Sequence, residues 1–272
     1  MFRRAFAALS FSLLLVAPAA AAQCGGSFPS FLAGMARDAE AQGISARTVN
    51  AAFSGLTPDR QVMAFDRRQQ HSFGGHESFE HFARTRVTAA RLHRAARLMR
   101  RHAALLKRIE ARFGVPKELL MAIWTMETDN GVGDMGHKPV VRTLATLAHN
   151  CRRSQLFQGE LISALRILQR GDLPPSQMIG AYAGEIGQTQ FLPSSYIKYG
   201  VDFDGDGHVD LRHSVADVLA STANLLRQNG WHPGQPYGEG TANFDVMREW
   251  NRSEVYRRAL VLFAHKLAGG EE

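Results

Sequence analysis

Apolar residues recur every three to four positions along most of the chain, which is the spacing of amphipathic helices. No convincing run of alternating apolar and polar residues predicts a strand. Residues 55–83, rich in His, Gln and Gly, are predicted to be irregular. The remaining pattern predicts two short helices within 28–54, separated by Gly43, and further helices at about 86–112, 116–128, 154–170, 194–199, 214–229 and 244–267. The predicted fold class is therefore mainly α.

Several of these helices carry recognisable end signals. Ser45 is a candidate N-cap, and Pro116 suits the first turn of the helix that follows it. Ser214 with Asp217 resembles a capping box, and Gly230 is a typical C-terminal stop. Arginines dominate the segment 86–112, and a solvated helix face explains them as simply as a binding role does.

The chain begins with the pattern of a signal peptide. Arg3 and Arg4 precede an apolar run over 5–16, and small residues follow at 20–22. The run is too short for a stable membrane anchor, so we expect cleavage after Ala22. The prediction is a signal peptide at 1–22, followed by a mature chain exported to the periplasm.

A lipid-modified Cys24 is a weaker alternative, because Gln23 stands where lipoprotein processing requires a small residue. The chain has two cysteines, Cys24 and Cys151, and two cysteines in an exported protein often form a disulfide. Two unrelated thiols are the alternative. Neither cysteine lies in a C-x-x-C motif, which argues against a zinc or redox site.

The formal net charge is +7, and a basic surface favours an acidic partner. An exported protein rarely meets nucleic acid, so we expect none as a partner. An anionic wall polymer or a membrane surface fits the compartment better. Solubility alone explains the charge equally well.

The segment LLMAIWTMETDNG presents one carboxyl on an apolar helix stripe. Leu120, Trp124 and Glu127 follow the spacing i, i+4, i+7 and share that stripe. Partial burial and the negative end of the helix dipole both oppose ionisation of Glu127. A carboxyl that stays protonated near neutral pH can act as a general acid. Taken alone, a surface glutamate at a helix end is the commoner explanation.

The segment AGEIGQTQFLPSSY, at 183–196, suits a sugar. Its glycines at 184 and 187 allow close approach of a ligand, and polar side chains surround Phe191. A buried turn before a helix is the alternative. A polar-aromatic cluster follows later in REWNRSEVY, at 248–256. The polar and aromatic candidates in the two segments are Gln188, Gln190, Ser194, Ser195, Tyr196, Trp250, Asn251, Ser253 and Tyr256.

The segment DFDGDGHVD, at 202–210, matches the opening of an EF-hand calcium loop. Carboxylates stand at alternate positions, Gly207 is sixth, and His213 replaces the usual glutamate at position twelve. Asp210 or Asp217 would then have to complete the shell. An Asp/Gly-rich turn without metal is the alternative. The predicted Ca²⁺ ligands are Asp202, Asp204, Asp206, the backbone carbonyl of His208, and Asp217.

The order of these segments resembles that of the membrane-bound B type of lytic murein transglycosylase, a family with a lysozyme-like fold. The likeness covers about residues 25–267. It rests on FGVPKELLMAIWTMETDNG, RTLATLAHNCRR, GEIGQTQFLPSSYIKYGVDFDGDG and SVADVLASTANLLRQNGW. The resemblance implies a catalytic domain over 23–272, with an N-terminal helical part at about 25–112 and a small EF-hand-like calcium loop.

The resemblance implies a role for each candidate residue. Glu127 becomes the catalytic acid and base, in an E-T variant of the family's E-S pair. Gln188, Gln190 and Phe191 match its substrate-cleft motif, with Ser194, Tyr196 and Tyr256 also expected to bind substrate. Trp250 and Asn251 stand in place of an aromatic–Asn pair, with Trp where Tyr is usual. Glu185 occupies a position that is neutral in many relatives.

The implied reaction is non-hydrolytic cleavage of the β-1,4 bond between N-acetylmuramic acid and N-acetylglucosamine, which leaves 1,6-anhydromuramic acid ends. The implied partner is the glycan strand of peptidoglycan, bound by a monomer. One alternative is a hydrolytic muramidase that uses Glu127 and Glu185, since hydrolases usually need two carboxylates. Another is a peptidoglycan-binding protein without activity, stabilised by calcium.

Overall fold

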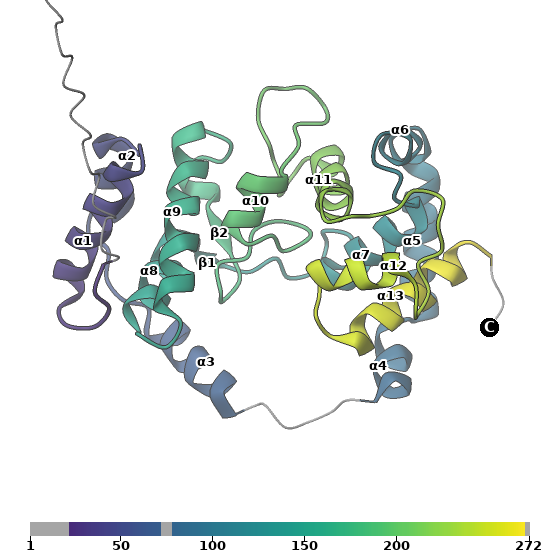
Figure 1. Cartoon of the computed structure of the whole chain (residues 1–272), viewed down its shortest axis with the longest axis horizontal. Helices are drawn as coiled ribbons and strands as arrows, with labels where there is room; N and C mark the ends of the chain where they lie inside the picture. Colours follow the sequence, from purple (N-terminus) through teal and green to yellow (C-terminus); the bar gives the residue numbers. More distant parts are fainter. Residues whose placement is uncertain (1–21, 72–77, 270–272) are drawn as a thin grey trace, which may run out of the picture.

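The computed structural model describes residues 22–71 and 78–269 and is mainly α-helical, as predicted (Figure 1). The predicted signal peptide lies outside the described residues except for Ala22. Across 22–71 and 78–269, no helix combines the length and apolar character needed to cross a membrane.

One end of the molecule is a group of packed helices (Figure 1). α8 and α9 pack on each other, α1 and α2 cover them, and α3 packs on α8. These helices are α1 (Phe28–Ala41), α2 (Ala46–Phe53), α3 (Arg60–His71), α8 (Val140–His149) and α9 (Ser154–Arg170).

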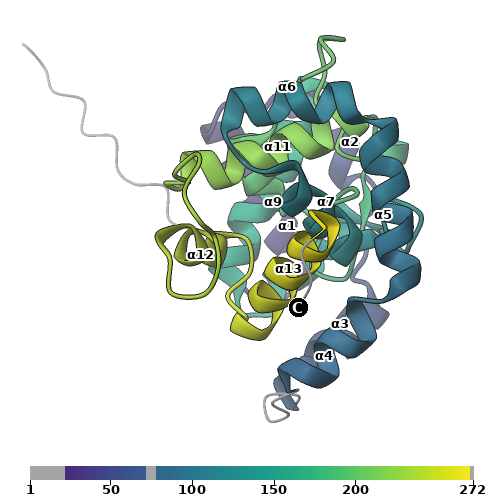
Figure 2. The same ribbon diagram turned by 90° about the vertical axis from the view of Figure 1, so that its right-hand side faces the viewer.

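The other half of the molecule surrounds α7 (Figures 1 and 2). Every residue of 119–126 in α7 is buried, because α5, α6, α11 and α13 pack against this helix or its neighbours. This half contains α4 (Phe79–Arg86), α5 (Ala89–Arg101), α6 (Ala103–Phe113), α7 (Lys117–Thr128), α11 (Val215–Gln228), α12 (Ala242–Val246) and α13 (Glu254–Leu267).

Short connecting elements lie between the two groups. Strands β1 (Lys138–Pro139) and β2 (Ile179–Gly180) pair antiparallel, with Lys138 opposite Gly180. The sequence did not predict them, since two residues are too few to show an alternation. α10 (Pro193–Tyr199) packs on both α9 and α11 and joins the two helical groups.

The prediction of irregular structure over 55–83 was wrong, because α3 and α4 lie there. The Asp59 carboxylate caps α3 by accepting hydrogen bonds from the N–H groups of Gln61 (2.8 Å) and Val62 (3.2 Å). α3 is mostly polar, so its packing on α8 stabilises it more than its own composition does.

The predicted end signals are largely confirmed. Ser45 caps α2 by accepting from the N–H of Thr48 (3.2 Å), and Ser214 caps α11 by accepting from the N–H of Asp217 (3.2 Å). The helix predicted at 86–112 is two helices, which separate at His102. Likewise, the helix predicted at 244–267 is divided into α12, a short 3₁₀ turn and α13.

A disulfide joins Cys24 to Cys151, with 5.1 Å between their Cα atoms, as the pairing of the two cysteines predicted. It fastens the segment before α1 to the turn between α8 and α9. Beside it, the N–H of Gly25 donates to the carbonyl of His149 (2.9 Å). A bridge that closes a loop of this length contributes about 2–4 kcal/mol to the free energy of unfolding.

Candidate active site

The last turn of α7 places Glu127 where a buried helix meets a cavity. The helix ends because Asp129 and Asn130 adopt left-handed conformations, with φ of 54° and 64°. The neighbours of Glu127 in the helix, Met126 and Thr128, are buried, whereas Glu127 is partly exposed.

Two donors hold one oxygen of the Glu127 carboxyl. The indole Nε1 of Trp250 donates to Oε1 over 3.1 Å, and the hydroxyl of Tyr256 donates to the same atom over 2.5 Å. No donor within the described part of the chain is recorded for Oε2. In a protonated carboxyl one oxygen accepts and the other carries the proton. We therefore place the proton of Glu127 on Oε2.

Both donors come from a distant part of the sequence, 123 and 129 residues after Glu127. Trp250 follows the 3₁₀ turn Met247–Glu249, and Tyr256 lies in the first turn of α13. Ser253 caps α13 and accepts from the N–H of Tyr256 (3.3 Å), while the ring of Trp250 meets Phe191 edge-on with centroids 5.5 Å apart. The position of the donors is therefore fixed by the cap and by aromatic packing.

The pKa of Glu127 is raised above its usual value, and burial is the main cause. The hydrogen bonds from Tyr256 and Trp250 act in the opposite direction, because they favour the anion. The negative charge of Glu185 raises the pKa further. The balance favours the protonated form that a general acid needs.

A cavity of about 660 Å³ opens in front of Glu127. Of the candidate residues in the two sugar-binding segments, five line it: Gln190, Phe191, Ser195, Trp250 and Asn251. Gln190 has a φ of 55°, and its amide Nε2 donates to the carbonyl of Gly187 (2.8 Å), which holds the turn against the cavity.

Gln188 is buried behind this wall. Its amide Oε1 accepts from the indole of Trp124 (2.8 Å), and its Nε2 donates to the carbonyl of Arg212 (2.7 Å). The turn at Gly131 passes so close that a Cβ there would lie 2.3 Å from the Gln188 Oε1. Gln188 thus supports the C-terminal end of α7, and we leave it out of the proposed binding surface.

Three more predicted residues lie outside the cavity wall. The hydroxyl of Ser194 donates to Glu160 (2.7 Å), and Tyr196 is fully buried with its hydroxyl on the carbonyl of Val209. Both support α10 and are likewise left out. Tyr256 also lies behind the wall but acts directly on Glu127.

Glu185 lies in the same cavity as Glu127. Its Oε2 accepts from the N–H of Ala183 (3.0 Å), so the backbone just before Gly184 orients the carboxylate. The structure thus brings together the two carboxyls that the sequence singled out.

The sequence missed the part of the cavity wall that α3 provides. That wall includes Phe65, which stacks on Tyr182 with ring centroids 4.4 Å apart. Asp66 also lies there and pairs with Arg152 and Arg153, the second of which lines the cavity. The Asp59 cap followed by apolar residues was the available signal, but predicting 55–83 as irregular hid it.

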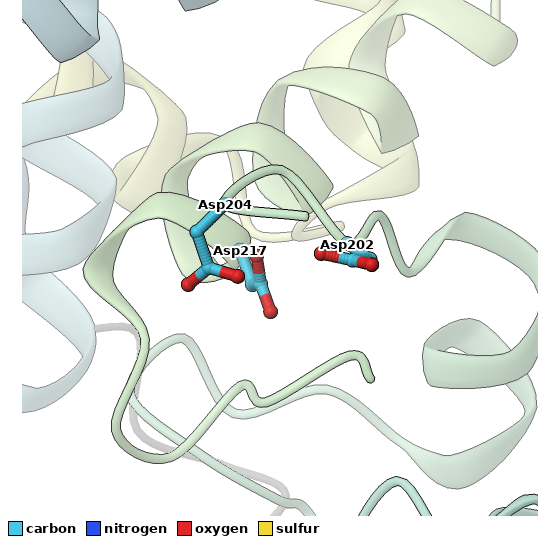
Figure 3. A group of neighbouring side chains, drawn as sticks. All are labelled: Asp202, Asp204 and Asp217. Carbon is cyan, nitrogen blue, oxygen red and sulfur yellow. The ribbon is translucent and has the colours of Figure 1, made fainter. Parts of the chain in front are cut away.

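Three carboxylates of the predicted calcium loop lie together (Figure 3). Asp202, Asp204 and Asp217 each offer an oxygen, and these atoms lie within 4.8 Å of one another. Asp217 is fully buried at the start of α11, where its two oxygens accept from the N–H groups of Phe203 (2.8 Å) and Asp210 (2.9 Å). The hard oxygen donors fit a Ca²⁺ ion.

Two other candidate carboxylates lie outside this group. Asp206 accepts from the N–H of His208 (2.9 Å) and is not one of the three grouped side chains. The backbone carbonyl of His208 stays a predicted ligand. Asp210 accepts from the N–H and the ring of His213 (3.0 and 2.9 Å). Of the two residues considered for completing the shell, Asp217 is the one in position.

Comparison with known proteins matches residues 27–240 to the family model of the transglycosylase SLT domain. The membrane-bound lytic murein transglycosylase B of Escherichia coli is 41% identical over 123 residues, 45% of this chain. That match covers 34% of the relative, so this chain aligns with about a third of its length.

Solved structures agree with the expected fold. SltB3 from Pseudomonas aeruginosa, in complex with NAG-anhNAM-pentapeptide, is 32% identical, with a TM-score of 0.83 over 90% of this chain and 80% of that chain. The lytic transglycosylase Slt35 of Escherichia coli, in complex with calcium, is 24% identical, with a TM-score of 0.76 over 91% of this chain and 96% of that chain. The second likeness concerns the fold alone.

Proposed function

Since this chain belongs to the transglycosylase SLT domain family, we propose that it cleaves the β-1,4 bond between N-acetylmuramic acid and N-acetylglucosamine in peptidoglycan and leaves 1,6-anhydromuramic acid ends. The observation that carries the proposal is the Glu127 carboxyl. Its Oε1 is held by Trp250 and Tyr256, it lines the cavity, and its pKa is raised.

The proposed reaction uses one carboxyl twice. Oε2 of Glu127 gives its proton to the glycosidic oxygen as the bond from that oxygen to C1 breaks, with the substrate's acetamide stabilising C1. The resulting carboxylate then takes the proton of the C6 hydroxyl while the C6 oxygen bonds to C1. The 1,6-anhydro ring closes, Glu127 is protonated again, and no water is consumed.

Trp250, supported by the buried ring of Phe191, presents apolar surface to the sugar rings, whereas Gln190 and Asn251 offer amides to hydroxyl and acetamide groups. These four residues form the proposed binding surface nearest Glu127. The relative SltB3, solved with a NAG-anhNAM-pentapeptide, supports a glycan with attached peptide as the ligand.

Glu185 favours a second candidate, a hydrolytic muramidase, because it adds a carboxylate to the same cavity. Digestion of purified peptidoglycan followed by mass spectrometry separates the two, since hydrolysis adds one water per bond cut and makes each muramic acid end heavier than the anhydro end by that water. We expect anhydro ends from the wild-type protein and no products from Glu127→Gln. Reducing muramic acid ends would reject the transglycosylase.

We also propose a structural Ca²⁺ ion held by Asp202, Asp204 and Asp217. The grouping of their oxygens supports this site, as does the calcium complex of the similarly folded Slt35. Bound calcium would join the loop at 202–206 to the start of α11 and offset the repulsion between the carboxylates.

Export to the periplasm by a cleavable signal peptide at 1–22 is part of the same proposal. The substrate lies outside the cytoplasm, and the disulfide fits an oxidising compartment. Comparison of the N-terminal sequence of the exported protein with Ala22 and Gln23 tests the cleavage position.

A further inference from the structure

α5 and α6 carry a concentration of positive charge. Residues 89–113 contain eight arginines and lysines and a single acidic residue, Glu110. This excess of seven equals the formal net charge of the entire chain. The exposed cations of the segment are Arg97, Arg100, Arg101, Lys107, Arg108 and Arg112.

Among the described residues none of these six cations is in an ion pair, and four of them also lie over no aromatic ring. We call those four, Arg97, Arg100, Arg101 and Lys107, the basic band. The other arginines of the segment each contact an acidic or an aromatic side chain. Arg91 and Arg94 pair with Asp129 (3.2 and 3.6 Å), beside the last turn of α7. Arg108 and Arg112 lie over the ring of Phe203 (5.0 and 5.7 Å).

The helices that carry the basic band, α5 and α6, lie at the end of the molecule opposite α1 (Figure 1), and Figure 2 shows them along the edge of their half. Within 22–71 and 78–269, the exposed large apolar residues are Val132, Leu156 and Tyr182, and none lies on α5 or α6. A lipid surface usually gains apolar side chains as well as cations from a helix that docks on it. The band offers charge alone, which suits a hydrated polyanion.

We propose that the basic band binds the carboxylate-bearing peptide stems of peptidoglycan and holds the protein on the wall beside the strand that it cuts. This inference rests on the proposed function for the identity of the polymer. Many weak contacts with a repeating polyanion would raise the local concentration of glycan at the cavity.

The test measures adsorption to purified sacculi by sedimentation, in a Glu127→Gln background so that the sacculi are not digested. The band variant replaces Arg97, Arg100, Arg101 and Lys107 with Gln. At low salt we expect adsorption about tenfold weaker, since each exposed charge contributes a few tenths of a kcal/mol. The difference should vanish at about 1 M salt, where the screening length falls to about 3 Å.

A matched control removes the same charge elsewhere. Arg37, Arg47, Arg60 and Lys198 are exposed, lie outside α5 and α6, and are likewise replaced with Gln. The control variant should adsorb as the parent does. Equal weakening of both variants would show a general charge effect and overturn the proposal, as would unchanged adsorption of the band variant.

Two further measurements fix the partner. Amidation of the sacculus carboxyls should weaken adsorption of the parent, and a band rebuilt with Lys should adsorb normally even if the Gln variant folds poorly. If the band variant lost binding to vesicles of anionic lipid but still adsorbed to sacculi as the parent does, the basic band would be a membrane-binding surface and our inference would be rejected. In proteins that retain Glu127, the band variant should cleave short soluble glycan strands at the same rate as the wild type. If neither protein released anhydro products, that result would count against the proposed function and not against the role of the band.

Discussion

Glu127 and the carboxylates of the loop at 202–206 show opposite uses of one functional group. Glu127 lies at the end of a buried helix, and burial raises its pKa. Asp202 lies in an open loop, and hydrogen bonds from the backbone N–H groups of Gly207 and Gly205 (2.9 and 2.6 Å) lower its pKa. Burial thus favours the protonated form of Glu127, whereas the backbone donors favour the charged form of Asp202.

The difference follows from where the donors come from. Main-chain N–H groups within five residues surround Asp202, so the loop builds an anion site from local sequence alone. Two side chains more than 120 residues away donate hydrogen bonds to Glu127, and both donate to Oε1. The Glu127 acid therefore depends on the tertiary fold, whereas one turn is enough to hold the Asp202 anion; the third carboxylate of the group, Asp217, is brought by α11.

The strongest test removes the acid. Glu127→Gln keeps the shape of the side chain but cannot donate a proton, so cleavage should fall by about 10²–10⁴-fold or more. Glu249→Gln, at an exposed glutamate of the same cavity wall, is the matched control and should stay active. The measurement is the release of anhydro sugars. Substantial turnover by Glu127→Gln would show that Glu127 is not the catalytic acid.

The loop is tested by its metal. Calcium at about 100 times its Kd should add about 2.7 kcal/mol to the free energy of unfolding, which raises Tm by roughly 5–10 °C in a protein of this size. Chelation should reverse the shift, and Asp204→Ala should blunt it. Glu40→Ala, at an exposed acid on α1, should respond as the wild type does. A melting curve that neither calcium nor chelator moves would leave the loop as a metal-free turn.

Removing one donor sharpens the account of Glu127. Tyr256→Phe keeps the ring beside Phe82 but deletes the bond to Oε1, and we expect turnover to fall about tenfold. That hydrogen bond lowers the pKa of Glu127, so its loss should move the high-pH limb of the rate profile to higher pH. Tyr182→Phe, in the cavity wall, serves as control. A limb that moves the other way contradicts the assignment.

The smallest expected effect concerns the second carboxyl. The charge of Glu185 raises the pKa of Glu127, so Glu185→Gln should shift the high-pH limb to lower pH. We expect the rate to stay within about fivefold of wild type, since a supporting charge contributes less than the acid itself. Products should remain anhydro sugars. An inactive variant, with reducing ends from the wild type, would make Glu185 a base and the protein a hydrolase.

Local features were the ones that the sequence revealed well. α9 was predicted at its observed bounds, and the caps at Ser45 and Ser214 were found, because each depends on neighbours along the chain. The aspartate spacing of the loop was visible for the same reason. Polar α3 was missed, since packing on α8 rather than its own periodicity stabilises it.

The sequence predicted which residues lie near the site better than it predicted the role of each residue. Gln188 and Gln190 look alike in the sequence, yet one is buried on Trp124 and the other lines the cavity. The direction of each side chain depends on the conformation of the turn. For Gln188 it also depends on the hydrogen bond from Trp124, which lies 64 residues earlier in the sequence. Similarly, nothing local to Trp250 or Tyr256 indicates that both donate to Glu127.

The bridge between Cys24 and Cys151 has a consequence for biogenesis. With two cysteines in the chain, one intramolecular pairing exists, so oxidative folding has no wrong isomer to correct. An oxidant suffices, and reshuffling of disulfides is unnecessary. Cys24 must wait for a partner 127 residues later, by which point the Glu127 helix has already been synthesised. Closure of the bridge therefore marks a chain that already contains its acid.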